Sequence, residues 1–166
     1  EVLPRIWAED GLAVDGPGYS SRGVTALPRP WQRPHPPIWV GGNSPAAMRR
    51  AVDHAQGWSP FPTPAGVESA VRTSAIADLD QLRVALGRAR ERCDAIGRTE
   101  PLTICFVPFS LQGYLRDPVG ELDALVDEVA TLVSMGVDWV ALSVPGLVRS
   151  EIIDRAAALA AALDLR

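Results

Sequence analysis

The residues best suited to chemistry form a short run, Gly41-Gly42-Asn43-Ser44, which follows the apolar residues Ile38-Trp39-Val40. The apolar residues are β-branched or aromatic and lie between prolines and glycines, which is typical of a short buried strand. Glycine allows backbone conformations that are closed to other residues, and Ser44 followed by Pro45 is typical of a helix start. Free backbone N–H groups at such a start, together with the positive end of the helix dipole, bind anions. The run therefore predicts a phosphate site; the alternative is a glycine turn that binds nothing.

Other chemical signals are weak. The glycine spacing matches neither the GxGxxG fingerprint nor the GxxxxGK(S/T) loop. His35 lies in a proline-rich segment and His54 near a predicted helix end, where surface roles are the usual ones. Cys93 and Cys105 have neither the spacing of metal ligands nor that of a disulfide framework, and no lysine is present to form a Schiff base. The residues alone therefore assign no catalytic group and no metal site.

Composition restricts the possible partners. The chain has 166 residues, a net charge of -4 and basic residues that are all arginines, scattered from Arg5 to Arg166. This balance does not suggest nucleic-acid binding. The sequence contains no signal peptide and no apolar run of membrane length, so a cytoplasmic protein without a membrane partner is expected.

The predicted strands and helices that would position the Gly41–Ser44 run alternate regularly along the chain. Apolar patterns predict strands at residues 38–41, 58–61, 102–107 and 137–144, and helices at 45–55, 67–96, 121–135 and 148–163. A short helix is expected over residues 1–8. Irregular chain is expected over 11–37, with a turn at Gly16-Pro17-Gly18 and a possible strand at 24–27. A loop is expected over 108–120.

Strands that alternate with helices require crossover connections, and these produce a parallel sheet with helices packed outside it. A complete eight-fold barrel needs about 250 residues, so the four βα units counted here amount to half of one. The predicted fold class is α/β, the C-terminal half of a TIM (β/α)8 barrel. Residues 1–36 are expected to be an insertion or linker and residues 37–166 the half-barrel.

Several motifs together resemble the luciferase-like monooxygenase superfamily, in particular its F420-dependent or FMN-dependent oxidoreductases. The main one runs from Pro36 through Gly41-Gly42-Asn43-Ser44 to Ala47, and continues with Arg49-Arg50-Ala51 and Gly57-Trp58. Supporting stretches are Trp7-Ala8-Glu9-Asp10, Leu27-Pro28-Arg29-Pro30 and Gly136-Val137-Asp138-Trp139-Val140. The resemblance implies that this chain supplies the fifth to eighth barrel strands.

The resemblance also implies a cofactor, coenzyme F420 or FMN, which moves a hydride to or from a small organic substrate. Its phosphate would bind at Gly41, Gly42, Asn43 and Ser44, through backbone N–H groups or the side chains of Asn43 and Ser44. Residues at or just past strand ends, where barrels build their sites, are expected to line the substrate pocket: Ser59, Phe61, Phe109 and Ser143. Catalytic residues stay unknown, because the family keeps most of them in the first half of the barrel.

An alternative reading is an inactive half-barrel remnant, or a binding or assembly module that needs an N-terminal half. In either reading, a four-stranded parallel sheet would have two unpaired edges and one bare apolar face. We therefore expect a homo-oligomer or pairing with an N-terminal half-barrel.

Overall fold

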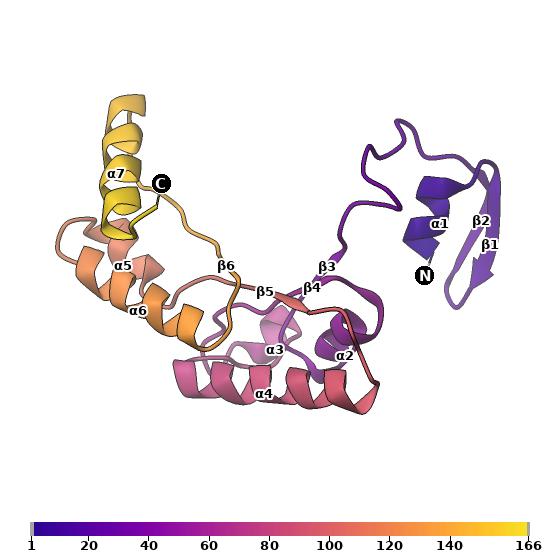
Figure 1. The fold of residues 1–166 in the computed structure, drawn as a ribbon, viewed down its shortest axis with the longest axis horizontal. Coiled ribbons are helices and arrows are strands. Elements are labelled where there is room, and N and C mark those ends of the chain that lie inside the picture. The colour runs from indigo at the N-terminus through magenta and orange to yellow at the C-terminus, as the bar shows by residue number, and fades with distance from the viewer. Residues whose placement is uncertain (1, 166) are drawn as a thin grey trace. The chain divides into compact units, whose positions relative to one another are not determined.

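The computed structural model describes residues 2–165, apart from the side chains of Glu68 and Ser69. The chain divides into two compact units, Glu1–Ile38 and Trp39–Arg166 (Figure 1). Each unit is described by itself below.

The first unit is a helix followed by a β-hairpin. Helix α1 spans Val2–Ala8, and strands β1 (Leu12–Gly16) and β2 (Tyr19–Val24) pair antiparallel around a turn in which Gly18 has a φ of 80°. The expectation of irregular chain from residue 11 onward was therefore wrong for this stretch, and so was the strand at 24–27. The polar sequence of β2 has no apolar alternation, so the backbone ladder and the glycine turn, rather than a buried face, specify the hairpin.

The second unit contains a four-stranded parallel sheet in the order β3-β4-β5-β6. The strands are β3 (Trp39–Gly41), β4 (Gly57–Ser59), β5 (Thr103–Phe106) and β6 (Trp139–Val140). Trp39 pairs with Gly57, Gly57 with Thr103, and Cys105 with Trp139. This arrangement confirms the expected α/β class with parallel strands.

Six helices accompany the sheet: α2 (Pro45–His54), α3 (Glu68–Val71), α4 (Leu79–Ala95), α5 (Leu111–Arg116), α6 (Leu122–Ser134) and α7 (Arg149–Ala162). The two helices beside the site begin at side-chain caps. The Ser44 hydroxyl accepts the Ala47 N–H at 3.1 Å, and the Asp78 carboxylate accepts the Gln81 N–H at 2.8 Å. These caps satisfy backbone donors that the first helical turn leaves free.

Three expected boundaries were wrong. The helix expected over 67–96 is two helices, because Ile76 forms a β-bridge with Thr63 and Asp78 then starts α4. The loop expected over 108–120 contains α5. The strand expected over 137–144 is reduced to two residues, since only Trp139 and Val140 have ladder partners on β5 among the described residues.

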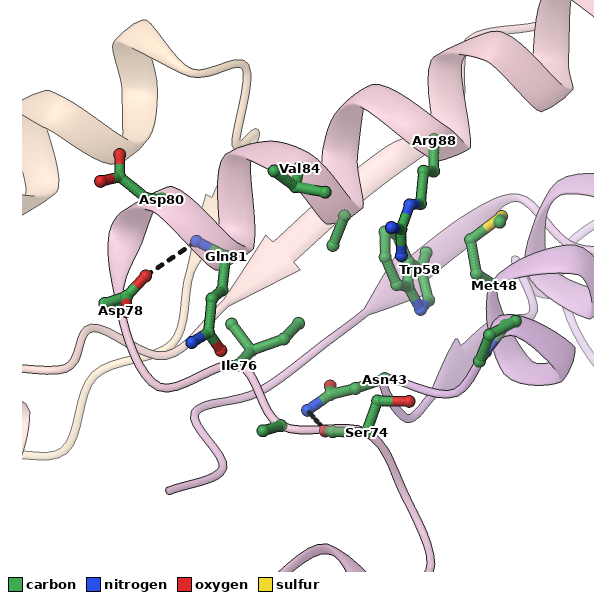
Figure 2. A pocket seen from close by; sticks show the side chains of 13 residues that line it. Asn43, Met48, Trp58, Ser74, Ile76, Asp78, Asp80, Gln81, Val84 and Arg88 are labelled. Atoms are coloured by element: carbon green, nitrogen blue, oxygen red, sulfur yellow. Dashed lines mark hydrogen bonds between the residues drawn. The ribbon is translucent and has the colours of Figure 1, made fainter. Parts of the chain in front are cut away.

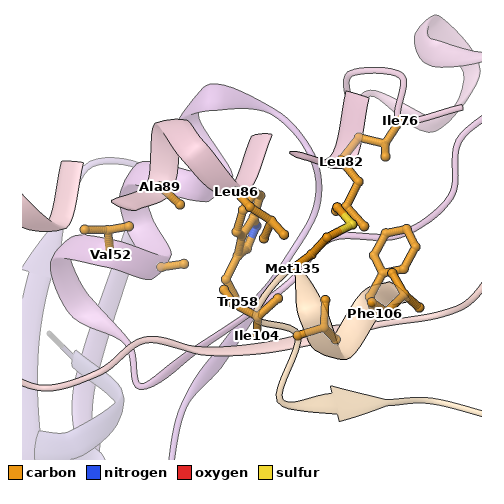
Figure 3. Close-up of a cluster of buried hydrophobic side chains, with 12 residues drawn as sticks. Val52, Trp58, Ile76, Leu82, Leu86, Ala89, Ile104, Phe106 and Met135 are labelled. Carbon is orange, nitrogen blue, oxygen red and sulfur yellow. The ribbon is translucent and has the colours of Figure 1, made fainter. Parts of the chain in front are cut away.

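The main core lies between one face of the sheet and the helices (Figure 3). Trp58, Ile104 and Phe106 point from the strands into this core, where they meet helix residues that include Leu82 and Leu86. Helices α2 and α4 pack next to each other, and a bidentate ion pair between Asp53 and Arg92 joins them at 2.8 and 3.0 Å. A smaller cluster around Tyr114, Leu125 and Leu159 connects α5, α6 and α7.

The opposite face of the sheet carries the side chains that alternate with those of the core. Trp39 is 40% exposed and Trp139 is 61% exposed, and their ring centroids lie 6.2 Å apart in an edge-to-face arrangement. The Trp39 indole lies over Gly57, where a Cβ would come within 2.6 Å of the ring. No helix of this unit covers the two indoles to the extent that helices cover Trp58.

Candidate functional site

The Gly41–Ser44 turn connects the end of β3 to the start of α2. Gly42 has a φ of 109°, a conformation that favours glycine, and a Cβ at this position would come within 3.3 Å of the Ala47 Cβ. The Trp58 indole N–H donates to the Gly42 carbonyl at 2.8 Å. A buried core residue therefore holds the turn in place.

The Asn43 side chain is fully engaged within the protein. Its Nδ2 group donates to the Phe61 carbonyl at 2.9 Å, the Thr63 hydroxyl at 3.0 Å and the Ser74 carbonyl at 2.9 Å, and its Oδ1 accepts the Phe61 N–H at 2.9 Å. Figure 2 shows the bond to Ser74. Asn43 is only 7% exposed, so this side chain ties the turn to the segment that follows β4. Both N–H groups of this amide are used within the protein, so Asn43 has no side-chain donor left for an anion.

The backbone donors of the turn are partly used as well. The Gly42 N–H donates to the Ser59 carbonyl at 3.3 Å, and the Asn43 N–H donates to the Thr73 hydroxyl at 2.7 Å. Within residues 2–165, the N–H groups of Ser44 and Ala46 have no protein acceptor. These two donors and the positive end of the α2 dipole are what the turn offers to an anion.

Two of the expected pocket residues lie together, and two do not. Phe61 and Phe109 line a cavity of about 570 Å³ formed by the segments that follow β4 and β5. None of the described residues that line this cavity carries a charge. Ser59 instead lies within β4, and Ser143 is exposed in the segment after β6. The cavity suits an uncharged, largely apolar molecule.

Cys105 lies on the bare face of the sheet, next to Ser59. Burial raises the pKa of the Cys105 thiol, and a hydrogen bond with the Ser59 side chain opposes this shift. A thiol whose pKa is raised is a poor nucleophile at neutral pH, so the structure gives Cys105 no sign of a catalytic role.

The sequence profile of the luciferase-like monooxygenase family matches residues 1–112. The chain belongs to this family. A curated relative, the FMNH2-dependent dimethylsulfone monooxygenase of Pseudomonas putida, is 44% identical over 50 residues, which are 30% of this chain and 14% of that enzyme. The crystal structure of monooxygenase RslO1 from Streptomyces bottropensis aligns with 96% of this chain at 19% identity and a TM-score of 0.47. This chain spans 48% of that structure, so the two are far from equal in length.

For this luciferase-like chain, sequence reasoning missed the residues that hold the site together. The hydroxyls of Thr63 and Thr73 accept hydrogen bonds from Asn43 of the turn. The sequence predicts only a loop around Thr63 and a helix around Thr73. The Glu128 carboxylate accepts the N–H groups of Phe109 and Ser110 at 2.7 and 2.8 Å, which fixes the segment that carries Phe109. No local signal identifies such long-range partners, because each depends on the tertiary fold.

Two further observations concern the described residues only. Among them, no group of three or more histidine, cysteine, aspartate or glutamate side chains is arranged to hold a metal ion. No helix within residues 2–165 is both long enough and apolar enough to cross a membrane.

Proposed function

We propose that this chain is the cofactor-binding part of a luciferase-like oxidoreductase that uses F420 or FMN. The observation that carries this proposal is the Gly41–Ser44 turn, where the N–H groups of Ser44 and Ala46 have no acceptor among the described residues at the start of α2. Two unused donors at a helix start suit a phosphate oxygen, which requires no cationic side chain there. The FMNH2-dependent relative supports a flavin phosphate as the group bound.

Each part of the site has a separate role in this proposal. The cofactor, when bound, supplies the hydride chemistry. The turn holds its phosphate, and Asn43 fixes the turn against the segment after β4 rather than touching the cofactor. The cavity between Phe61 and Phe109 accepts a small organic substrate between uncharged walls.

The bare face of the sheet favours a half-barrel that needs a second half for turnover. Trp39 and Trp139 are exposed on the face that would form the interior of a barrel. We propose that residues 37–166 act as a half-barrel, preceded by residues 1–36 as an insertion, and that turnover requires a completing half. The isolated chain should then bind cofactor but turn over more slowly than about 1 per second, the lower range of ordinary enzymes. Faster turnover by the isolated chain would show that no other half is needed.

The phosphate assignment is tested at Gly42. Gly42→Val should weaken the binding of FMN and F420, followed by cofactor fluorescence, at least about tenfold, or about 1.4 kcal/mol, because the side chain crowds the turn. Gly97→Val is the matched control: Gly97 also has a positive φ, of 63°, but follows the far end of α4. Both variants should lose stability through backbone strain, and only Gly42→Val should lose cofactor affinity. Equal affinities in the two variants would contradict the phosphate assignment.

A further inference from the structure

A second cavity, of about 480 Å³, lies between α2 and α4 and borders the turn (Figure 2). Asn43 and Pro45 line it at the turn, and Met48, Trp58 and Val84 provide apolar walls. Its volume lies in the range of small-molecule sites. A group bound at the start of α2 would therefore be adjacent to this space.

Among the described residues that line this cavity, Arg88 is the one with a positively charged side chain. Figure 2 shows its side chain reaching from α4 toward Trp58. Neighbouring arginines of α4 are paired, Arg83 with Asp80 and Arg92 with Asp53. The Arg88 side chain has no ion pair or hydrogen bond with any residue that the structure describes between positions 2 and 165. Its guanidinium is free to bind an anion.

Two acidic residues also line the cavity, but each already has a hydrogen-bond or ion-pair partner, and both lie far from Arg88 along α4. The Asp78 carboxylate caps α4 by accepting the Gln81 N–H, and Asp80 pairs with Arg83. They precede Arg88 by ten and eight residues, which corresponds to about 12–15 Å of helix rise, more than the screening length of about 8 Å at physiological salt. The region around Arg88 is therefore positive despite these carboxylates.

The ion pair between α2 and α4 indicates how near Arg88 is to the turn. Asp53 of α2 and Arg92 of α4 lie at the same height along the two helices, because their side chains form an ion pair. Both helices follow neighbouring parallel strands, so the two helices run in similar directions. One helical turn before this pair, Arg88 on α4 lies at about the same height along the helices as Arg49 on α2. This level is roughly 6 Å of helix rise beyond Pro45, the first residue of α2.

We propose that the cavity between α2 and α4 binds an anionic chain that continues beyond the cofactor phosphate, and that Arg88 binds a carboxylate of that chain. The inference rests on the proposed function. F420 carries glutamyl groups beyond its phosphate, whereas FMN ends at its phosphate. Guanidinium binds carboxylate through paired, charge-assisted hydrogen bonds, and the apolar walls suit the methylene groups between carboxylates. The cavity therefore favours F420 over FMN.

The test compares both cofactors on three proteins, the unmodified chain, Arg88→Gln and Arg83→Gln, by fluorescence titration. Arg88→Gln should lower the affinity for F420 about tenfold and leave that for FMN within about twofold. Arg83→Gln removes an equal charge from the same helix and should change neither affinity. Thermal unfolding of Arg88→Gln should match that of the unmodified chain, because the Arg88 side chain makes no hydrogen bond or ion pair within the described residues.

The outcomes separate the two proposals. If FMN and F420 both bind but Arg88→Gln affects neither, or affects both equally, the inference about the anionic chain is wrong and the phosphate site stands. If Arg83→Gln lowers F420 affinity as much as Arg88→Gln does, net charge rather than this cavity is responsible, and the inference again fails. If the unmodified chain binds neither cofactor, both proposals are wrong.

Discussion

The two faces of the four-stranded sheet each present tryptophan, in very different surroundings. Trp58 on the helix-covered face is 1% exposed and packs in the core, whereas Trp139 on the opposite face is 61% exposed. The same residue type thus lies in a finished core on β4 and on a bare surface on β6. Apolar surface of the second kind usually marks a place that another element covers.

This difference shows what the chain can and cannot stabilise alone. Helices α2 and α4 supply the partners of the covered face, and the parallel sheet forms on that basis. Among the described residues, the bare face has the contact between Trp39 and Trp139, the packing of Trp39 over Gly57, and the half-buried Thr103 and Cys105. The covered face should therefore carry most of the stability, and the bare face most of the capacity for association.

The largest expected effect is on stability. Trp58→Ala should lower the free energy of unfolding by about 3–5 kcal/mol, because it leaves a cavity in the core and removes the bond to Gly42. Trp139→Ala should change it by only about 0.5 kcal/mol, as at other surface positions. Urea unfolding followed by circular dichroism measures both.

Trp58→Phe is the control for this pair, because it keeps most of the ring volume and removes only the indole N–H. Its loss should lie between those of the other two variants. If Trp139→Ala destabilised the chain as much as Trp58→Ala, the bare face would already be part of a core.

The contrast between the faces also explains which features the sequence could predict. The strand at β3, the glycine turn and the capped start of α2 follow from local residue types, and the structure has all three. The expected burial of this strand was wrong, because Trp39 lies on the bare face and is 40% exposed. The break between α3 and α4 could not be predicted in this way, because the apolar residue Ile76 fits a helical pattern while its backbone pairs with Thr63 from another segment. The length of β6 likewise depends on whether a neighbouring strand is present to pair with it.

In the candidate site, too, local features could be predicted from the sequence and long-range contacts could not. Gly42 and Ser44 were predictable from turn and cap preferences, which are local. The engagement of Asn43 by Phe61, Thr63 and Ser74 was not, since those partners are 18 to 31 residues away in sequence. Arg88 is one of several surface arginines in the sequence, and only the fold places it on the cavity that also borders the turn.

The second prediction concerns association through the bare face. We expect the chain to self-associate at micromolar concentrations, because β3 and β6 are unpaired sheet edges and the two indoles are exposed. Replacing Trp39 and Trp139 together by serine should raise the dissociation constant at least about tenfold, since buried tryptophans dominate interfaces. Sedimentation equilibrium over a dilution series measures this change.

A matched pair of substitutions tests whether this effect is specific to the bare face. Val84 is also an exposed apolar residue, but it lies on α4 on the covered side, and Val84→Ser should leave association unchanged. A monodisperse monomer with a cooperative thermal transition would contradict the prediction. It would mean that some element of the chain already shields the indoles in solution.

The smallest expected effect concerns the ion pair that joins α2 to α4 above the covered face. A hydrogen bond from Arg92 is the main cause that lowers the pKa of the Asp53 carboxyl below its ordinary value of 3.8. A lowered pKa means that the pair stabilises the folded state above the ordinary pKa, and that this stabilisation is lost as the pH falls through the folded-state pKa. The coupling between Asp53→Asn and Arg92→Gln in a double-mutant cycle should therefore be present at about pH 7 and should weaken as the pH falls below the ordinary pKa of 3.8 and through the folded-state pKa. Because both side chains keep access to water, the coupling should be far smaller than the loss from Trp58→Ala. A coupling that rivalled the Trp58 effect, or that persisted in acid, would show that charge rather than packing holds the helices on the covered face.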